Sequence, residues 1–108
     1  RHSPDAFATD ALALVLAQEA IRKKFDIGLD KRRKAFLYMP FMHSESAEIH
    51  EIAMCLFDKP EMENHFNYEI KHKGIIDRFG RYPHRNKILG RESTGEELEF
   101  LKLSGSSF

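Results

Sequence analysis

The spacing of the apolar residues constrains this fold more than any other feature of the sequence. Apolar residues recur every three or four positions in segments that proline and glycine separate, which is the pattern of amphipathic helices. Alternation with a period of two, which would indicate half-buried strands, is not convincing in any segment. We therefore predict an all-α fold of antiparallel helical hairpins, a tetratricopeptide-like array of four to five helices.

The first predicted helix occupies the region before Gly28. Ser3 is placed to cap it and Pro4 to occupy its first position, where proline loses no hydrogen bond. Its apolar stripe is broad enough that we expect it to face a core on more than one side. The predicted stripe consists of Ala11, Leu14, Val15, Gln18 and Ile21, widened by Leu12, Leu16 and Ala20.

The next two helices are expected on either side of Pro40. Residues 35–39 form a short apolar run that we assign to a helix, and Pro40 should kink or end it. Ser44 or Ser46 can cap the third helix. The apolar positions of that helix, at helical spacing, are Ile49, Ile52, Ala53, Leu56 and Phe57.

Local signals also define the last third of the chain. Pro60 precedes a fourth helix that ends at Gly80, and its predicted inner face consists of Tyr68, His72, Ile75 and Phe79, with Ile76 beside them. Pro83 is expected to start a short helical turn that reaches Leu89. Thr94 and Glu97 have the spacing of a capping box, which opens a last helix to about Leu103.

Length and charge narrow the function classes. A chain of 108 residues is one domain at most, and we place it at residues 1–103, followed by a flexible tail at 104–108. Seventeen basic residues balance seventeen acidic ones, whereas a general nucleic-acid binder shows a basic excess. No apolar stretch is long enough to span a membrane. The single cysteine, Cys55, is predicted to be a buried thiol, and its isolation is consistent with a reducing, cytoplasmic location.

Charged residues are concentrated in two blocks of opposite sign. Residues 71–91 contain seven basic side chains and one acidic side chain, whereas residues 45–63 contain six acidic side chains and one basic side chain. Two solvated helix faces, or two faces that pair with each other, would account for this pattern. The alternative is an anion site, because arginine presents a planar fork that suits phosphate or carboxylate.

Two short motifs, "HSE" and "RYPHRN", contain the candidate site residues. In one interpretation these side chains line a polar pocket in which Arg85 holds an anion and His43 or His84 moves a proton. In the other they pin loops together, with Arg81 or Arg85 paired to Glu45. The candidates are His43, Ser44, Glu45, Arg81, His84, Arg85, Asn86 and Arg91.

Neither nucleophilic nor metal chemistry is predicted at these motifs. Residues adjacent in the chain rarely reach catalytic geometry, so Ser44 is not assigned as a nucleophile beside His43. The six histidines show no zinc-binding spacing and there is no cysteine pair. We therefore predict no metal and no cofactor. His50, His65 and His72 are expected to be surface or packing residues.

Three stretches, "AFATDALALVLAQEAI", "FLYMPFMHSES" and "RFGRYPHRNKILGRESTGEELEFL", resemble an uncharacterised bacterial family, the domain of unknown function numbered 924. The resemblance implies an all-α, tetratricopeptide-like fold and no established reaction. The family motif maps onto His43, Ser44 and Glu45, and onto Arg81, Pro83, His84, Arg85, Asn86, Gly90 and Arg91. Tyr82 stands where phenylalanine is common and Gly95 where proline is common.

The resemblance also implies that this chain corresponds to the C-terminal part of a larger family domain, because it lacks the family's N-terminal helical region. An apolar face would then be exposed or covered by another copy, which makes a homo-oligomer an expectation. The function predicted from the sequence is a protein- or peptide-interaction module. The alternative is a small-anion-binding or hydrolase-like site at the two motifs, and whether the chain is an enzyme is left open.

Overall fold

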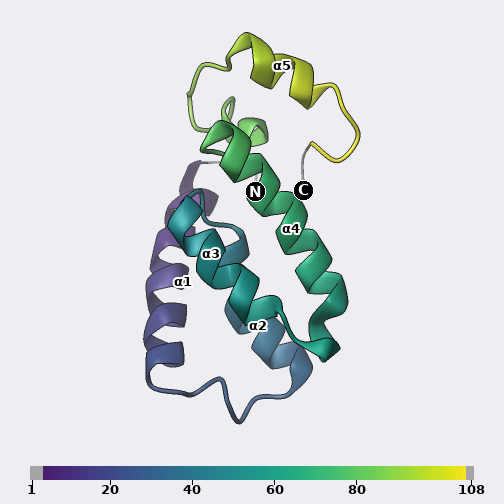
Figure 1. The fold of residues 1–108 in the computed structure, drawn as a ribbon. Coiled ribbons are helices and arrows are strands. Elements are labelled where there is room, and N and C mark those ends of the chain that lie inside the picture. Colours follow the sequence, from purple (N-terminus) through teal and green to yellow (C-terminus); the bar gives the residue numbers. More distant parts are fainter. Residues whose placement is uncertain (1–3, 107–108) are drawn as a thin grey trace.

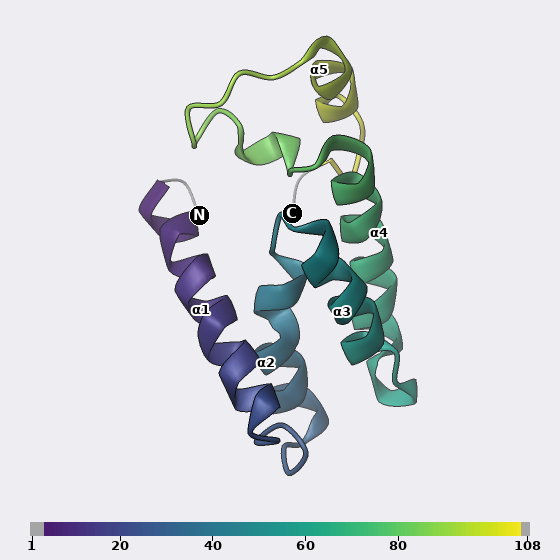
Figure 2. The same ribbon diagram turned by 60° about the vertical axis from the view of Figure 1, so that its left-hand side comes forward.

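The computed structural model describes residues 4–106, which contain five α-helices, two short 3₁₀ turns and no strand. The helices are α1 (Pro4–Arg22), α2 (Lys31–Met42), α3 (Ala47–Phe57), α4 (Glu63–Phe79) and α5 (Gly95–Leu101). The 3₁₀ turns are η1 (Pro60–Met62) and η2 (Pro83–Arg85). Helices α1 to α4 alternate in direction, and α5 lies across the end of α4 (Figures 1 and 2). The prediction of an all-α fold of antiparallel hairpins is confirmed.

Three helix ends follow local signals that the sequence predicted. Ser46 caps α3 and Gly80 ends α4 with φ +73°, and Thr94 and Glu97 form the complete capping box of α5. The prediction for α1 was wrong at its C-terminus, because the helix ends at Arg22, well before Gly28. Lys24 has φ +62° there, and the Phe25 amide donates to the Ala20 carbonyl as in a Schellman cap. Ser3 lies outside the described residues.

Pro40 lies inside α2 and does not end it. The helix continues through Pro40 to Met42 and stops at His43. A proline this close to a helix end removes a single intrahelical hydrogen bond and still allows a last half turn. His43 therefore lies at the start of the loop that joins α2 to α3.

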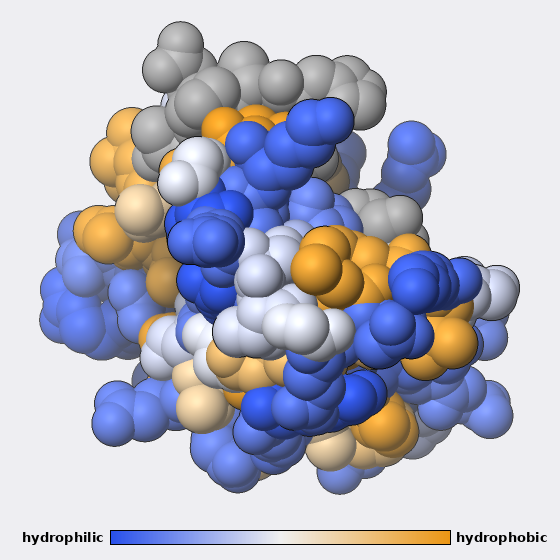
Figure 3. Space-filling view, turned by 90° about the horizontal axis from the view of Figure 1, so that it is seen from above, coloured by the Kyte–Doolittle hydropathy of each residue, from blue (hydrophilic) through white to orange (hydrophobic). Residues whose placement is uncertain are grey.

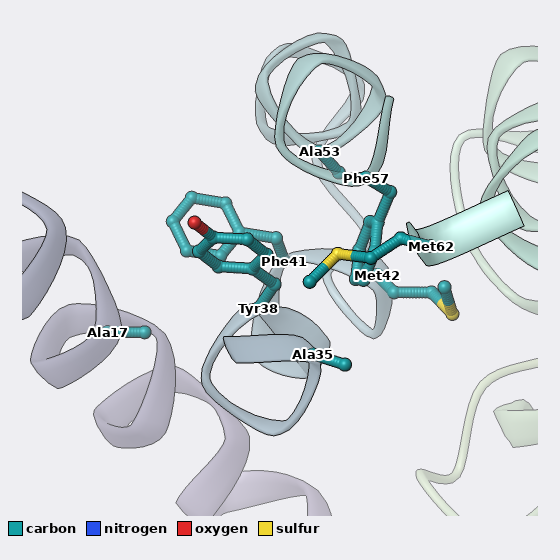
Figure 4. Close-up of a cluster of buried hydrophobic side chains, with 8 residues drawn as sticks. All are labelled: Ala17, Ala35, Tyr38, Phe41, Met42, Ala53, Phe57 and Met62. Carbon is teal, nitrogen blue, oxygen red and sulfur yellow. The ribbon is translucent and has the colours of Figure 1, made fainter. Parts of the chain in front are cut away.

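The first hydrophobic cluster lies between α1, α2 and α3 and is closed by η1 (Figure 4). Tyr38, Phe41 and Phe57 are its large aromatic members, and the rings of Tyr38 and Phe57 meet edge to face at 5.8 Å. Met62 of η1 is fully buried in the same cluster. Rings in edge-to-face contact add a specific attraction to the area that they bury.

The predicted inner face of α1 was partly wrong. Leu14 and Ile21 pack on the first cluster, and the buried Ala17 was not predicted. Leu12, Val15 and Leu16 are instead about 60% exposed, at 61%, 59% and 62%. Gln18 and Ala11 are also exposed. The stripe is broad because α1 is apolar on two sides, of which α2 covers one.

Three further burial predictions were wrong. Cys55 is exposed, because it lies on the outer face of α3. Ile52 of α3 and Tyr68 of α4 are 46% and 58% exposed.

A second, smaller hydrophobic cluster joins the end of α4 to α5 and consists of Ile75, Ile76 and Tyr82, with Phe79 and Phe100 against it. None of the helices within residues 4–106 is long and apolar enough to cross a bilayer.

Candidate functional site

Both candidate motifs lie at the end of the molecule that carries α5. The "HSE" residues form the loop between α2 and α3, and "RYPHRN" runs from the end of α4 through η2. Seen from above, this end shows hydrophilic surface around separate apolar patches (Figure 3). The fold therefore brings the two motifs together, and Glu45, Tyr82, Arg85 and Arg91 make direct contacts across them.

Glu45 is the acceptor at the centre of these contacts. Its Oε2 accepts from the Tyr82 amide at 2.6 Å, and Arg91 donates to both carboxylate oxygens at 2.9 and 3.0 Å. Partial burial acts to raise the pKa of Glu45, but the hydrogen bonds from Arg91 and from the Tyr82 amide outweigh it and lower that pKa. The expectation that Arg81 or Arg85 pairs with Glu45 was wrong, since Arg91 takes that position.

Arg91 also organises its own loop. Its Nε donates to the Asn86 side-chain oxygen at 3.0 Å, and its Nη2 donates to the Tyr82 carbonyl at 3.2 Å. The Asn86 amide group donates to the Ser93 hydroxyl at 3.0 Å. Asn86 is 1% exposed, so these bonds replace water that the buried amide has lost.

Arg81 holds α5. Its guanidinium makes a bidentate pair with Glu97 at 2.9 and 2.7 Å and also donates to the Glu92 carbonyl. This arginine, together with the capping bond from the Thr94 amide, lowers the pKa of Glu97 to about 2. The planar fork of arginine matches the two oxygens of a carboxylate, so Arg81 ties the end of α4 to the start of α5.

Arg85 is buried between two aromatic rings. Its guanidinium carbon lies 4.8 Å from the centre of the Phe7 ring and 4.7 Å from that of Tyr82. Nη2 donates to the His43 carbonyl at 3.0 Å and lies 4.0 Å from the Asp10 carboxylate. Cation–π contacts of this kind are strongest where water is excluded. Arg85 therefore joins α1, the end of α2 and η2.

The remaining candidates, His43, Ser44 and His84, make contacts of other kinds. His84 is half-buried and its ring lies 5.9 Å from that of Tyr82. His43 lies 6.4 Å from His72, ring centre to ring centre. The hydroxyl of Ser44 accepts from the Ser46 amide at 3.0 Å, which is a turn contact and not a pairing with a base.

Sequence reasoning missed a buried network behind the motifs. His50 is fully buried, with Nε2 2.6 Å from the Ser44 carbonyl and Nδ1 2.6 Å from Glu69 Oε2. A carbonyl only accepts, so His50 Nε2 is the donor in its bond with Ser44. The Tyr82 hydroxyl donates to the Met42 carbonyl at 2.6 Å and lies 3.0 Å from His50 Nε2. The only sequence signal was a polar residue at a core position of α3 and of α4.

Burial shifts the pKa of Glu69 in this network and that of His72, whose ring contacts Tyr82. It raises the pKa of Glu69, although the hydrogen bond from His50 opposes the change. It also lowers the pKa of His72 to about 4, against the hydrogen bond that its Nδ1 makes with the Tyr68 carbonyl. Desolvation disfavours the charged form in both groups. Of the three histidines expected to be surface or packing residues, His50 and His72 are buried and His65 is half-buried.

Metal ligation has no support in the described part of the chain, where no group of three or more His, Cys, Asp or Glu side chains has suitable geometry. A groove of about 1020 Å³ lies elsewhere, along the first half of α2. Its lining residues are Asp30, Lys31, Arg32, Arg33, Ala35, Phe36 and Met39, with His65 from α4. The sequence did not single out this groove.

Comparison with known proteins places the chain in a family. Residues 1–105 match the model of a family described as "Bacterial protein of unknown function (DUF924)". No curated protein is significantly similar in sequence. A solved structure, that of the protein of unknown function ATU0120 from Agrobacterium tumefaciens, superimposes with a TM-score of 0.88 at 38% identity. The match covers 94% of this chain and 57% of that protein, so the chain spans little more than half of its relative. The family match and the identity together show that this chain belongs to the DUF924 family of bacterial proteins of unknown function.

Proposed function

We propose that this chain is a tetratricopeptide-like interaction module whose groove along α2 binds an acidic, amphipathic peptide. The observation that supports the proposal most directly is Phe36, which is 82% exposed and lines the groove. Ligand sites are concave and lined by hydrophobic and aromatic side chains, so an aromatic residue exposed in a groove is a candidate anchor. Ala35 and Met39 supply the rest of an apolar floor.

Charge determines which peptide fits. Lys31, Arg32 and Arg33 line the groove, and Lys34 follows them in the chain. Lys31 and Arg32 form no ion pair with any described residue, and Arg33 is 3.9 Å from Asp30. The protein as a whole has no net charge, so the positive charge beside the groove is a local feature. Carboxylates of a peptide would complement it.

The position of these cations supports a role in binding. They occupy the first turn of α2, which contains no acidic residue. The positive end of the helix dipole lies there, so cations at these positions are unfavourable for the helix. A sequence selected for stability alone would place acidic residues at these positions.

The proposal is tested by fluorescence anisotropy with two labelled peptides. One has leucines at helical spacing and flanking glutamates, and the other has lysines in place of the glutamates. We expect the acidic peptide to bind, and Phe36→Ala to weaken it at least tenfold. Phe25→Ala is the matched control, because Phe25 is 64% exposed and does not line the groove. Equal effects of the two alanine variants, or no binding by the acidic peptide, would reject the proposal.

A small-anion site at the two motifs is the second candidate, and the buried guanidinium of Arg85 favours it. Arg85 is 6% exposed, and a guanidinium keeps its positive charge even when it is buried. Thermal unfolding with added inorganic phosphate tests this candidate. A stabilisation by phosphate that Arg85→Ala abolishes and Arg91→Ala retains would support it. No stabilisation of the unmodified protein would leave Arg85 as a structural residue.

A further inference from the structure

The loop between α1 and α2, residues 23–30, turns an acidic side chain inward and two large apolar side chains outward. Asp26 is half-buried, and its carboxylate accepts a hydrogen bond from the Tyr38 hydroxyl at 2.5 Å. The residues on either side of it, Phe25 and Ile27, are 64% and 69% exposed. Phenylalanine and isoleucine are normally buried on folding, so this reversal is informative. We refer to Phe25 and Ile27 as the loop pair.

The loop pair lies on a projecting end of the molecule. In both ribbon views the loop lies at the end opposite α5 (Figures 1 and 2). Neither residue of the pair lines the groove along α2. A site for a peptide or a small molecule is concave, whereas apolar side chains on a projecting loop suit a surface that they can enter.

Basic residues flank the loop pair on both sides in the chain. Residues 22–34 contain seven basic side chains and two acidic ones. Both acidic groups are engaged within the protein, Asp26 by the Tyr38 hydroxyl and Asp30 by the Arg33 amide at the start of α2. Three exposed cations of this segment form no ion pair within the described part of the chain, namely Lys24, Lys31 and Arg32. The segment therefore presents positive charge to solvent.

The arginines at the other end of the molecule are neutralised instead. Arg78, Arg81 and Arg91 each pair with a glutamate, at 3.0, 2.7 and 2.9 Å. Uncompensated positive charge and exposed large apolar side chains thus occur together at the loop. That combination complements the interface of an anionic bilayer, whose headgroups attract cations and whose acyl boundary accepts apolar side chains.

We propose that the loop between α1 and α2 binds the surface of an anionic lipid bilayer, with the loop pair inserted at the level of the headgroups. Contact of this kind is peripheral and requires no membrane-spanning helix. Glu61 and Glu63 line a small pocket together with Lys31, and anionic headgroups would repel these carboxylates. The bilayer therefore approaches from the side of the loop, and η1 is turned away from it.

A single introduced tryptophan tests the contact, because the sequence contains none. The emission of Phe25→Trp should shift to the blue when vesicles of phosphatidylcholine mixed with phosphatidylglycerol are added, and should not shift with phosphatidylcholine alone. Added salt should reduce the shift, because it screens the charge of the headgroups. Leu103→Trp is the matched control, since Leu103 is 59% exposed and lies beyond α5.

Co-sedimentation with the mixed vesicles measures the affinity. A double serine variant, Phe25→Ser with Ile27→Ser, should weaken binding roughly tenfold, and Lys24→Glu should also weaken it. Circular dichroism establishes that each variant is folded. Phe36→Ala should leave vesicle binding unchanged, and Phe25→Ala should leave peptide binding unchanged. Failure of the groove proposal and failure of this one are therefore distinguishable.

Three outcomes would overturn the inference. The mixed vesicles cause no blue shift in Phe25→Trp, or an equal shift in Leu103→Trp. The double serine variant sediments with the mixed vesicles as the unmodified protein does. Alternatively, ultracentrifugation without vesicles shows a dimer that the double serine variant dissociates, in which case the loop pair contacts a second copy of this chain.

Discussion

At the scale of single residues, Glu45 and Arg91 hold the two motifs together. Glu45 accepts three hydrogen bonds from the other motif and its flank, two of them from one guanidinium. Both side chains are about a quarter exposed, at 24% and 25%. Partial burial lets the ion pair contribute to stability, and partial exposure lets solvent screening limit that contribution. The pair closes a loop between residues 46 positions apart in the chain.

We predict that Arg91→Ala lowers the free energy of unfolding by about 1–3 kcal/mol, because it leaves the Glu45 carboxylate with one donor instead of three. Arg91→Lys should recover little of the loss, since an ammonium group cannot donate in a planar fork to both oxygens. Urea unfolding measures each change. Arg32→Ala is the control, as an exposed arginine without an ion pair in the described chain, and should change stability by less than about 0.5 kcal/mol. Full recovery by lysine would mean that charge alone matters.

At the scale of elements, a helix can end at a residue whose backbone conformation only some residue types adopt without strain. Gly80 has φ +73° at the end of α4, whereas Gly74 lies inside that helix. A Cβ added at either position meets nothing within 4 Å. The two positions therefore differ only in backbone conformation, which makes them a matched pair.

We predict that Gly80→Ala destabilises the protein by about 1–2 kcal/mol, because an L-residue with a side chain is strained in the left-handed region. Gly74→Ala should stabilise it by about 0.5–1 kcal/mol, because alanine loses less entropy than glycine in a helix. Thermal melting followed by circular dichroism measures both changes. If both variants shift the melting temperature in the same direction, backbone conformation does not determine the end of α4.

At the scale of the whole molecule, the fold contains two hydrophobic clusters and a buried polar network. The first cluster lies among α1, α2 and α3, and the second joins α4 to α5 in a molecule 45 Å long. The network consists of His50 and Glu69, both fully buried, and of the hydroxyl of Tyr82, whose ring belongs to the second cluster. Burial of titratable groups in such a network couples the stability of the fold to pH.

We predict that stability falls as the pH decreases from about 6.5 to about 4, the pKa values of unfolded and folded His72. In this window the His72 imidazole binds more protons in the unfolded chain than in the folded one, so this group contributes a loss of stability on the order of 3 kcal/mol as the pH falls. The raised pKa of Glu69 acts in the opposite direction. His72→Phe should flatten the curve of stability against pH in this window.

Glu97→Gln should act in a lower window, between about 4.5 and about 2, because a lowered carboxyl pKa stabilises the fold only while the group stays ionised. Urea unfolding at stepped pH measures both, and identical curves for His72→Phe and the unmodified protein would contradict the assignment.

The sequence by itself determined the elements and much of the site's location. Apolar spacing predicted the helices, and Ser46, Gly80 and Thr94 predicted their ends, because caps and stops act within one turn of the chain. Composition indicated that "HSE" and "RYPHRN" belong together. Only the tertiary structure decided which partners meet. It paired Arg91 with Glu45 and Arg81 with Glu97, buried His50 against Glu69, and left Leu12, Val15, Leu16 and Phe36 in water. Which side chains meet depends on how helices far apart in the sequence pack together, and periodicity within one helix does not specify which of two apolar faces a neighbour will cover.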